Sequence, residues 1–599
     1  MAASNVRLRL EELGEGVNKW KVGVVIGVGI LGVAGVWLYR KRRRNTLNNG
    51  NVRGLLDSNQ NADIAKGKAS EPKTLHEKAM DAKAKGNKYF KGQMFEQAIT
   101  CYSEAMALCP EEHLQDLAAC YQNRAAAYEQ LKDFQSVVDD CTKALELNKH
   151  YIKAMNRRCR AYEQLKSYES ALEDITAVCI LEGFTNQGNL LIADRIIKEM
   201  SKVKCRELYS TRKAILPSNF FVRNYFAGFT NDPIVNLGNV GKEQSLVNGV
   251  GGMAQVKSEE TMTEEESTQD SVENGEPETE QLSPYEQAVR DLENNQFEEI
   301  LGLCAAEIDR SDSPHAAKAL LLRATFSILC GLGDQALTDL SNLLQMDGLD
   351  PKIVVNALIK QGTLNLQRSE ELMALECFSK AEKVDPNNAD IFHHRGMQYL
   401  LQEKPDLAIV DFDRSISIRP DFPTSNIQKC YAVHRQAVLK EDSELLQKAS
   451  LAFKDILRRF PNCSDAYTLY GQSLADQGRF AEADDVYSKA MELEPDNPNT
   501  KVHRGLLYLQ WKQDMAGCLK LIEEAIALDP KCEYAYEILG TLNIQLGKMD
   551  EALTNFKQAV EFSKSESEMC HLLSMVDAAT VQIRVANRLG LTVPTHNNL

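Results

Sequence analysis

Five polar side chains in the first third of the sequence have types and spacings suited to binding carboxylates. Lys83 and Asn87 lie four residues apart, as do Lys153 and Arg157, and Asn123 lies between the two pairs. Residues four apart share one face of a helix. Cations supply charge-assisted hydrogen bonds to carboxylates, and amides orient the carboxylate oxygens. If their helices converge, these five residues form a groove that holds two carboxylates at once.

Other patterns that could carry chemistry lack the context that the chemistry needs. Gly27, Gly29 and Gly32 match the spacing of a dinucleotide-binding loop, but we expect no strand before them and no amphipathic helix after them. His393 and His394 are adjacent on an expected helix and therefore point to different faces. We expect no enzyme activity, no catalytic residues, no cofactor and no metal site.

Charge and cysteine usage narrow the class of partner. The net charge of −16 argues against a general nucleic-acid binder, because phosphate binding needs a basic surface. The 15 cysteines are scattered, with no Cys-x-x-Cys motif and no Cys/His cluster at zinc spacing. We expect free thiols in a reducing compartment.

An internal repeat explains how the five polar side chains are positioned. With repeat position 1 at Ala79, small and aromatic residues fall where a tetratricopeptide repeat needs them, and the register returns from Ala118 and Ile152. This repeat is a helix–turn–helix of 34 residues. The register fades after Leu181 and returns over 285–599. The sequence therefore predicts an all-α superhelix in two modules, with roughly three repeats in the first and eight in the second.

A membrane anchor is predicted before the repeats. Residues 22–39 contain no charged residue and would span about 27 Å as a helix, enough for a bilayer core. The five cations of 40–44 follow directly, so the positive-inside rule keeps the large C-terminal part in the cytosol. The span is only moderately hydrophobic, which favours the mitochondrial outer membrane over the endoplasmic reticulum. We expect a single-pass protein of that membrane.

These features divide the chain into six parts. Residues 257–280 are strongly acidic and separate the two repeat arrays, so a disordered linker is expected around them. The predicted parts are a short segment on the intermembrane side (1–21), a transmembrane helix (22–39), a basic stop and flexible tether (40–78), the N-terminal repeat module (79–230), the acidic linker (231–283) and the C-terminal repeat module (284–599).

The five polar residues and the repeats together resemble a known family. Lys83, Asn87, Asn123, Lys153 and Arg157 match the dicarboxylate clamp of co-chaperone repeat domains. With the anchor and the later repeats, the whole chain resembles the seventy-kilodalton import receptors of the mitochondrial outer-membrane translocase. That resemblance implies binding of the Glu-Glu-Val-Asp tails of seventy- and ninety-kilodalton heat-shock chaperones. It also implies transfer of hydrophobic preproteins, such as inner-membrane carriers, to the outer-membrane pore beside other translocase subunits.

The preprotein site is harder to locate from sequence. The repeat frames place six apolar residues on or near the inner face of the C-terminal module, where they could hold targeting segments. Each of them could equally be ordinary core between helices. They are Ile359, Leu366, Met397, Leu400, Leu506 and Leu509. Two alternatives to a receptor stay open at this stage: a structural tether that only holds complexes together, and a regulatory subunit that targets an enzyme.

Overall fold

The computed structural model describes residues 73–234, 282–368 and 370–590. Within these ranges it contains 25 α-helices and no strand. The all-α prediction is therefore confirmed for this part of the chain. No helix within the described ranges is long and apolar enough to cross a membrane. The predicted membrane span (22–39) and most of the predicted linker (231–283) lie outside the described residues.

Three antiparallel helix pairs form the N-terminal module. Thr74 closes a capping box on the first helix, which therefore begins at Leu75, four residues before the predicted repeat start at Ala79. Fully buried alanines let neighbouring helices approach closely, among them Ala79 and Ala154. The pairs are α3 (Leu75–Lys91) with α4 (Phe95–Leu108), α5 (Leu114–Gln130) with α6 (Phe134–Leu147), and α7 (Ile152–Gln164) with α8 (Tyr168–Leu181).

Eight further helix pairs form the C-terminal module. They follow a long helix, α9 (Gln187–Thr211), and a short one, α10 (Asn219–Ala227). The pairs are α12 (Pro284–Glu293) with α13 (Ile300–Ile308), α14 (Ala316–Leu329) with α15 (Gly333–Leu343), α16 (Pro351–Gln367) with α17 (Glu371–Val384), α18 (Ala389–Leu401) with α19 (Pro405–Ile418), α20 (Pro423–Leu439) with α21 (Ser443–Arg459), α22 (Ser464–Asp476) with α23 (Phe480–Leu493), α24 (Pro498–Lys512) with α25 (Met515–Leu528), and α26 (Glu533–Gln545) with α27 (Met549–Phe562). The last described helix, α28, runs from Glu566 to Arg588.

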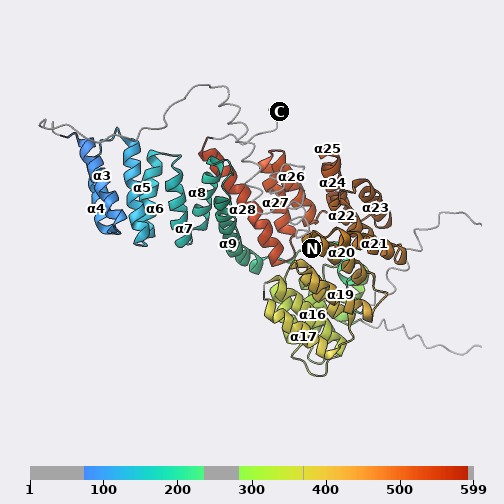
Figure 1. The fold of residues 1–599 in the computed structure, drawn as a ribbon. Coiled ribbons are helices and arrows are strands. Elements are labelled where there is room, and N and C mark those ends of the chain that lie inside the picture. Colours follow the sequence, from blue (N-terminus) through green and yellow to red (C-terminus); the bar gives the residue numbers. More distant parts are fainter. Residues whose placement is uncertain (1–72, 235–281, 369, 591–599) are drawn as a thin grey trace, which may run out of the picture.

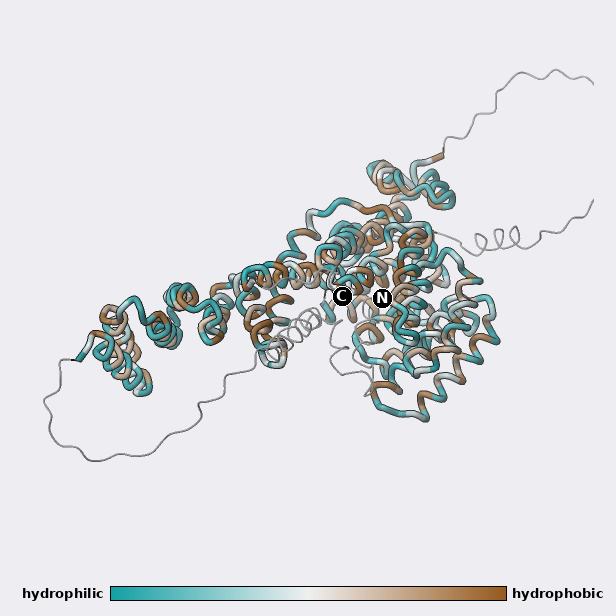
Figure 2. Tube along the Cα trace, turned by 90° about the horizontal axis from the view of Figure 1, so that it is seen from above, coloured by the Kyte–Doolittle hydropathy of each residue, from teal (hydrophilic) through white to brown (hydrophobic). Residues whose placement is uncertain are grey.

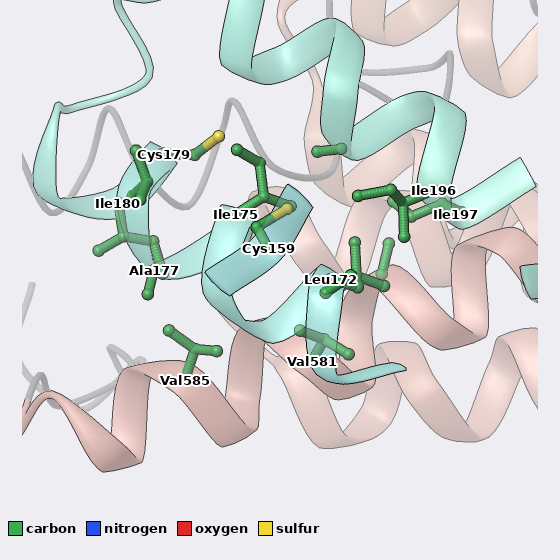
Figure 3. Packing of buried hydrophobic residues seen from close by; sticks show 14 of the residues in the cluster. Cys159, Leu172, Ile175, Ala177, Cys179, Ile180, Ile196, Ile197, Val581 and Val585 are labelled. Atoms are coloured by element: carbon green, nitrogen blue, oxygen red, sulfur yellow. The ribbon is translucent and has the colours of Figure 1, made fainter. Parts of the chain in front are cut away.

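The two modules meet where α28 packs against α8 and α9. Figure 1 shows the N-terminal pairs as a row that leads to α9 and α28, beyond which the C-terminal pairs follow. Seen from above, the N-terminal row extends as an arm from a broader C-terminal body (Figure 2). In Figure 3, Val581 of α28 lies beside Leu172 of α8 and Val585 lies nearer to Ala177, within one buried cluster that also holds Ile196 of α9. Burial of this shared apolar surface holds the modules together.

A repeated ion pair ties the two helices of several repeats together. In each case an Arg on the first helix donates two hydrogen bonds to a buried Asp on the second, with nitrogen–oxygen distances of 2.7–2.9 Å. Arg and Asp are always 16 residues apart. The pairs are Arg124–Asp140, Arg158–Asp174, Arg323–Asp339 and Arg395–Asp411. Bidentate geometry of this kind fixes how the two helices are oriented.

A glycine opposite a ring sets the crossing distance within the α26–α27 pair. A Cβ added at Gly540 would lie 2.6 Å from the Phe556 ring, which is fully buried. We expect Gly540→Ala to lower the free energy of unfolding by about 1–3 kcal/mol through overpacking. Denaturant unfolding followed by circular dichroism measures this change.

Gly302 provides the matched control for that prediction. It is also helical, but a Cβ added there would meet its nearest neighbour, the Glu299 carboxylate, only at 3.9 Å. Gly302→Ala should therefore be neutral or stabilising by up to about 1 kcal/mol, because alanine favours helices. Equal effects of the two substitutions would contradict the steric explanation.

Candidate carboxylate-binding site

The five predicted clamp residues come from the first helix of each N-terminal pair. Lys83 and Asn87 lie on α3, Asn123 lies on α5, and Lys153 and Arg157 lie on α7. α5 packs against both α3 and α7, so the three helices are neighbours. The repeat architecture thus carries side chains from distant parts of the sequence to one side of the module.

The two amides are brought into direct contact. The Asn123 Nδ2 group donates a hydrogen bond to the Asn87 Oδ1 atom at 3.1 Å. The hydroxyl of Tyr102, a buried residue of α4, donates to the same oxygen at 2.8 Å. Because the Asn87 oxygen accepts both bonds, its NH₂ group is the end that can donate to a ligand. Tyr102 was not predicted to take part, and it fixes the orientation of this amide.

Each of two clamp cations already holds a carboxylate of the protein. The Lys83 Nζ atom lies 3.1 Å from Asp116 Oδ1. The Arg157 guanidinium donates to Glu129 Oε2 at 2.7 Å and to the Gln122 carbonyl oxygen at 3.0 Å. Asp116 and Glu129 both belong to α5, between the helices that carry the cations.

Two neighbouring arginines keep the Glu129 carboxyl group ionised. Burial would raise the pKa of its carboxyl group, but hydrogen bonds from Arg160 and Arg157 outweigh burial and lower the pKa below its usual value. Glu129 therefore stays ionised at neutral pH and holds the Arg157 side chain in place. A ligand carboxylate must compete with it for Arg157.

Tyr151 shows that the two cations act on one region. Burial raises the pKa of its hydroxyl, and the positive charges of Lys83 and Arg157 both oppose that increase. Tyr151 also donates a hydrogen bond to the Gln122 side chain at 3.3 Å. The region of α3, α5 and α7 that holds Lys83, Arg157 and the contacting pair of amides is here called the trough. Lys153, one helical turn before Arg157 on α7, is exposed.

The chemistry of this trough suits an acidic chain end. Two cations and two amides are enough to bind two carboxylates with charge-assisted and orienting hydrogen bonds. Asp116 and Glu129 occupy the cations in the same way that ligand carboxylates would. A tail that carries both a terminal and a side-chain carboxylate could replace both partners in one step.

One group of possible metal ligands lies beside the trough. The His76 and His113 rings stack with their centroids 3.7 Å apart, and His76 Nε2 lies 3.6 Å from Asp116 Oδ2. One ligand atom from each of these three residues falls within 4.8 Å of the others. A cation bound there would compete with Lys83 for Asp116.

The adjacent histidines of α18 have separate surroundings. His393 is buried and hydrogen-bonds to the Ser425 hydroxyl at 2.9 Å, whereas the His394 ring lies against Phe229 at 4.3 Å between centroids. Burial lowers the pKa of His394 to about 4, helped by the nearby positive charge of Lys360. Burial lowers the pKa of His393 as well, so both rings are neutral at physiological pH.

The six predicted preprotein contacts divide among separate clusters between helices. Ile359 and Met397 are buried, while the other four side chains are half-buried. Ile359 and Leu366 share one cluster, Met397 and Leu400 a second, and Leu506 and Leu509 a third. The half-buried leucines are the members with surface left to offer a ligand.

A segment that the repeat pattern did not predict lies across the C-terminal module. Residues 212–234, here called the crossing segment, bond to helices that are far apart in the sequence. The Ser218 hydroxyl donates to Asp529 at 2.7 Å, Arg223 donates to Asp496 at 2.9 Å, and the Thr230 amide donates to Asp390 at 2.9 Å. The predicted N-terminal module ran to residue 230, but these contacts join its last residues to the C-terminal array.

Aromatic rings fix the crossing segment to the start of the C-terminal array. Val222 and Phe226 are buried in one cluster with helices α12 to α14, and Phe229 packs on the cluster that holds Ile359 and Leu366. The sequence signal was the unusual density of aromatic residues at 220–229, which carries no repeat register. Ile359 and Leu366, two of the six predicted preprotein contacts, thus share a cluster with the crossing segment.

Comparison with known proteins adds independent information. Models of the tetratricopeptide repeat match residues 118–151, 434–498 and 534–566. The TOM70 mitochondrial import receptor subunit of Homo sapiens is 40% identical over 598 residues, which cover 97% of this chain and 94% of the human protein. The TOM70 subunit of Saccharomyces cerevisiae is 23% identical over 85% of this chain and 80% of its own length. The crystal structure of yeast Tom70 aligns over 86% of this chain and 99% of its own, with 21% identity and a TM-score of 0.44.

The identity to the human protein extends over the N-terminal and C-terminal repeats alike, because the alignment covers almost the whole of both chains. Rattus norvegicus TOM70 gives the same identity over 96% of this chain. With such identity over nearly its full length, this chain belongs to the family of TOM70 mitochondrial import receptor subunits.

Proposed function

We propose that this chain is a mitochondrial import receptor that docks cytosolic chaperones through the trough between α3, α5 and α7. Its ligands there are the C-terminal tails of the seventy- and ninety-kilodalton heat-shock chaperones. The observation that carries the proposal is the meeting of Asn87 with Asn123 beside two cations that act on the same tyrosine. Membership of the TOM70 family supports it.

The C-terminal module receives the cargo in this proposal. Hydrophobic preproteins with internal targeting signals, such as inner-membrane carriers, bind there and pass to the outer-membrane pore, in contact with other translocase subunits. The half-buried side chains of Leu400, Leu506 and Leu509 supply apolar surface for such segments, and Leu366 does so where the crossing segment leaves it accessible. Ile359 and Met397 act only as packing beneath that surface.

The proposed location is the mitochondrial outer membrane. Residues 22–39 span the bilayer once, 1–21 lie on the intermembrane side, and 40–78 form the stop and tether. The chaperone module (79–230) and the cargo module (284–599) then lie in the cytosol, joined by the acidic linker (231–283). The uncharged span and the five cations that follow it support this arrangement.

Removal of Arg157 tests the chaperone proposal. Charge-assisted hydrogen bonds contribute about 1.5–3 kcal/mol each. Arg157→Ala should therefore weaken binding of a peptide ending in Glu-Glu-Val-Asp by roughly tenfold to a hundredfold. Isothermal titration of the peptide into the full chain measures the affinity.

Arg160→Ala is the matched control. Arg160 donates to the same Glu129 carboxylate at 2.9 Å, but its side chain is 53% exposed against 16% for Arg157. Its removal takes away the same charge and should change the affinity by less than about 1 kcal/mol. Unchanged affinity in Arg157→Ala, or equal losses in both variants, would remove Arg157 from the binding site.

A further inference from the structure

Two cysteines from different modules meet where α9 packs against α28. Cys205 of α9 is buried in a small cluster with Tyr209, Met569 and Leu573, and Cys570 of α28 packs on the same cluster. The two residues are 365 positions apart in the sequence, so only the packing of the modules brings them together. All the cysteines of the chain are free thiols in this structure.

A hydrogen bond holds the Cys205 thiol of α9 against the first turn of α28. The thiol donates this bond to the carbonyl oxygen of Glu566 at 3.2 Å. Glu566 is the first residue of α28, and Cys570 follows it by one helical turn on the same face. Cys205 and Cys570 therefore lie together on one small apolar cluster at the start of α28.

Their environments differ in the way that a reactive and a resolving cysteine differ. Cys570 is partly exposed, whereas Cys205 is buried. The neighbouring Cys205 thiol lowers the pKa of the Cys570 thiol below its ordinary value, against the opposing effect of burial. Burial instead raises the pKa of other thiols in the arrays, to about 12 at Cys141 and Cys518. Since the thiolate is the nucleophile, Cys570 is the more reactive thiol of the pair.

We propose that Cys205 and Cys570 are a modification site, at which a peroxide forms a reversible disulfide between the two modules. The Cys570 thiolate attacks one peroxide oxygen, so that an S–O bond forms, the O–O bond breaks and the hydroxide released takes up a proton to become water. The Cys205 thiol then gives up its proton as its sulfur attacks the Cys570 sulfur. The S–S bond forms, the S–O bond breaks and a second water leaves. Two thiols lose two electrons, and the peroxide gains them.

The disulfide would act on the joint between the modules. At this joint α9 is otherwise held to α28 by apolar packing and by noncovalent bonds, such as the ion pair between Lys204 and Asp577 at 2.6 Å. A covalent link beside that ion pair would keep α9 on α28 when the noncovalent contacts open. Disulfides in reducing compartments are typically transient and regulatory, and cellular thiols would reverse this one by exchange.

Peptide mapping of the oxidised full chain tests the proposal. Trypsin cleaves after Lys204 and Arg206 and leaves Cys205 on a dipeptide; cleavage after Lys564 and Arg584 leaves Cys570 as the single cysteine of 565–584. After brief treatment with dilute hydrogen peroxide and alkylation of the remaining thiols, mass spectrometry should find these two peptides joined. A reducing agent should separate them again.

Two single variants define the order of the steps. In Cys205→Ser the sulfenic acid of Cys570 has no resolving thiol, so dimedone should label peptide 565–584. In Cys570→Ser the buried Cys205 should stay unlabelled. Cys463→Ser is the control, because this residue is also partly exposed but lies on the start of another repeat, and it should leave the crosslink unchanged. Absence of the joined peptides in the wild-type chain overturns the proposal, as does equal dimedone labelling of Cys570 with and without Cys205.

Discussion

Replacement of Asp232 by alanine should lower the free energy of unfolding by about 3–5 kcal/mol, because it leaves the charge of Lys360 buried without its counter-ion. The Lys360 side chain is 1% exposed, and its Nζ atom lies 3.4 Å from Asp232 Oδ2 and 2.8 Å from the Thr325 hydroxyl. Tyr225 and Phe229 of the crossing segment flank it, with ring centroids 5.9 and 5.1 Å from Nζ. Loss of Asp232 therefore acts on the anchor of the crossing segment. Denaturant unfolding of the full chain measures the change.

The pH dependence of this variant distinguishes a charge effect from lost packing. Burial lowers the pKa of Lys360, although Asp232 opposes the shift. Without Asp232 the pKa falls further, and the unfolded chain then binds more protons than the native chain up to the ordinary lysine pKa of about 10.4. The stability of Asp232→Ala should therefore rise with pH toward that value more steeply than that of the wild type.

A double variant controls for the size of the effect. Asp232→Asn combined with Lys360→Met removes both charges and keeps similar volumes, and such replacements are often neutral. It should recover most of the stability lost in Asp232→Ala. If the double variant is as unstable as Asp232→Ala, and the loss does not depend on pH, the buried charge is not the cause.

Local patterns in the sequence were sufficient to predict the repeats. Several helix pairs have a small residue at their crossing and an aromatic ring at a fixed offset, as with Gly540 and Phe556, and these contacts are made within one repeat. The paired Arg and Asp, 16 residues apart, follow the same logic. They could have been found by searching the repeat frames for charges of opposite sign, since both partners hold constant positions in the repeat.

Contacts between distant parts of the chain were not predictable in this way. The crossing segment binds partners such as Asp390 and Asp529, which lie 160 and 311 residues from their bonding partners and follow no period. Its register with the array depends on the superhelical curvature, which no local pattern encodes. The meeting of α9 with α28 has the same origin, and so does the contact between their cysteines.

The residue types of the candidate site were predictable from the sequence, but the ion pairs that its cations form without a ligand were not. Repeat positions indicated that Lys83, Asn87 and Arg157 point to one side, and the structure packs both of their helices, α3 and α7, against α5. The carboxylates that occupy the cations, Asp116 and Glu129, gave no such signal, because acidic residues are common on exposed helix surfaces. They matter for affinity, because a ligand gains only the difference between its own bonds and those it displaces.

Removal of Lys83 and Arg157 together should lower the affinity for a peptide ending in Glu-Glu-Val-Asp by about 3–6 kcal/mol, which is more than a hundredfold. In the proposed complex each cation supplies one charge-assisted contact to a different carboxylate of the ligand, and the two side chains belong to different helices, α3 and α7. Titration of the peptide into the full chain gives the loss. The binding should also weaken with added salt in the wild type and lose most of that salt dependence in the variant.

Two comparisons make this prediction specific to the trough. Lys85→Ala with Lys88→Ala removes the same charge from exposed positions of α3 and should leave the affinity nearly unchanged. Asp116→Asn should act in the opposite direction, because it releases Lys83 from a partner at 3.1 Å and spares the ligand that competition. We expect a gain of up to about 1 kcal/mol, the usual worth of a partly exposed ion pair. A loss of affinity in Asp116→Asn would mean that Asp116 positions Lys83 for the ligand, and equal losses in the two double variants would mean that net charge alone drives binding.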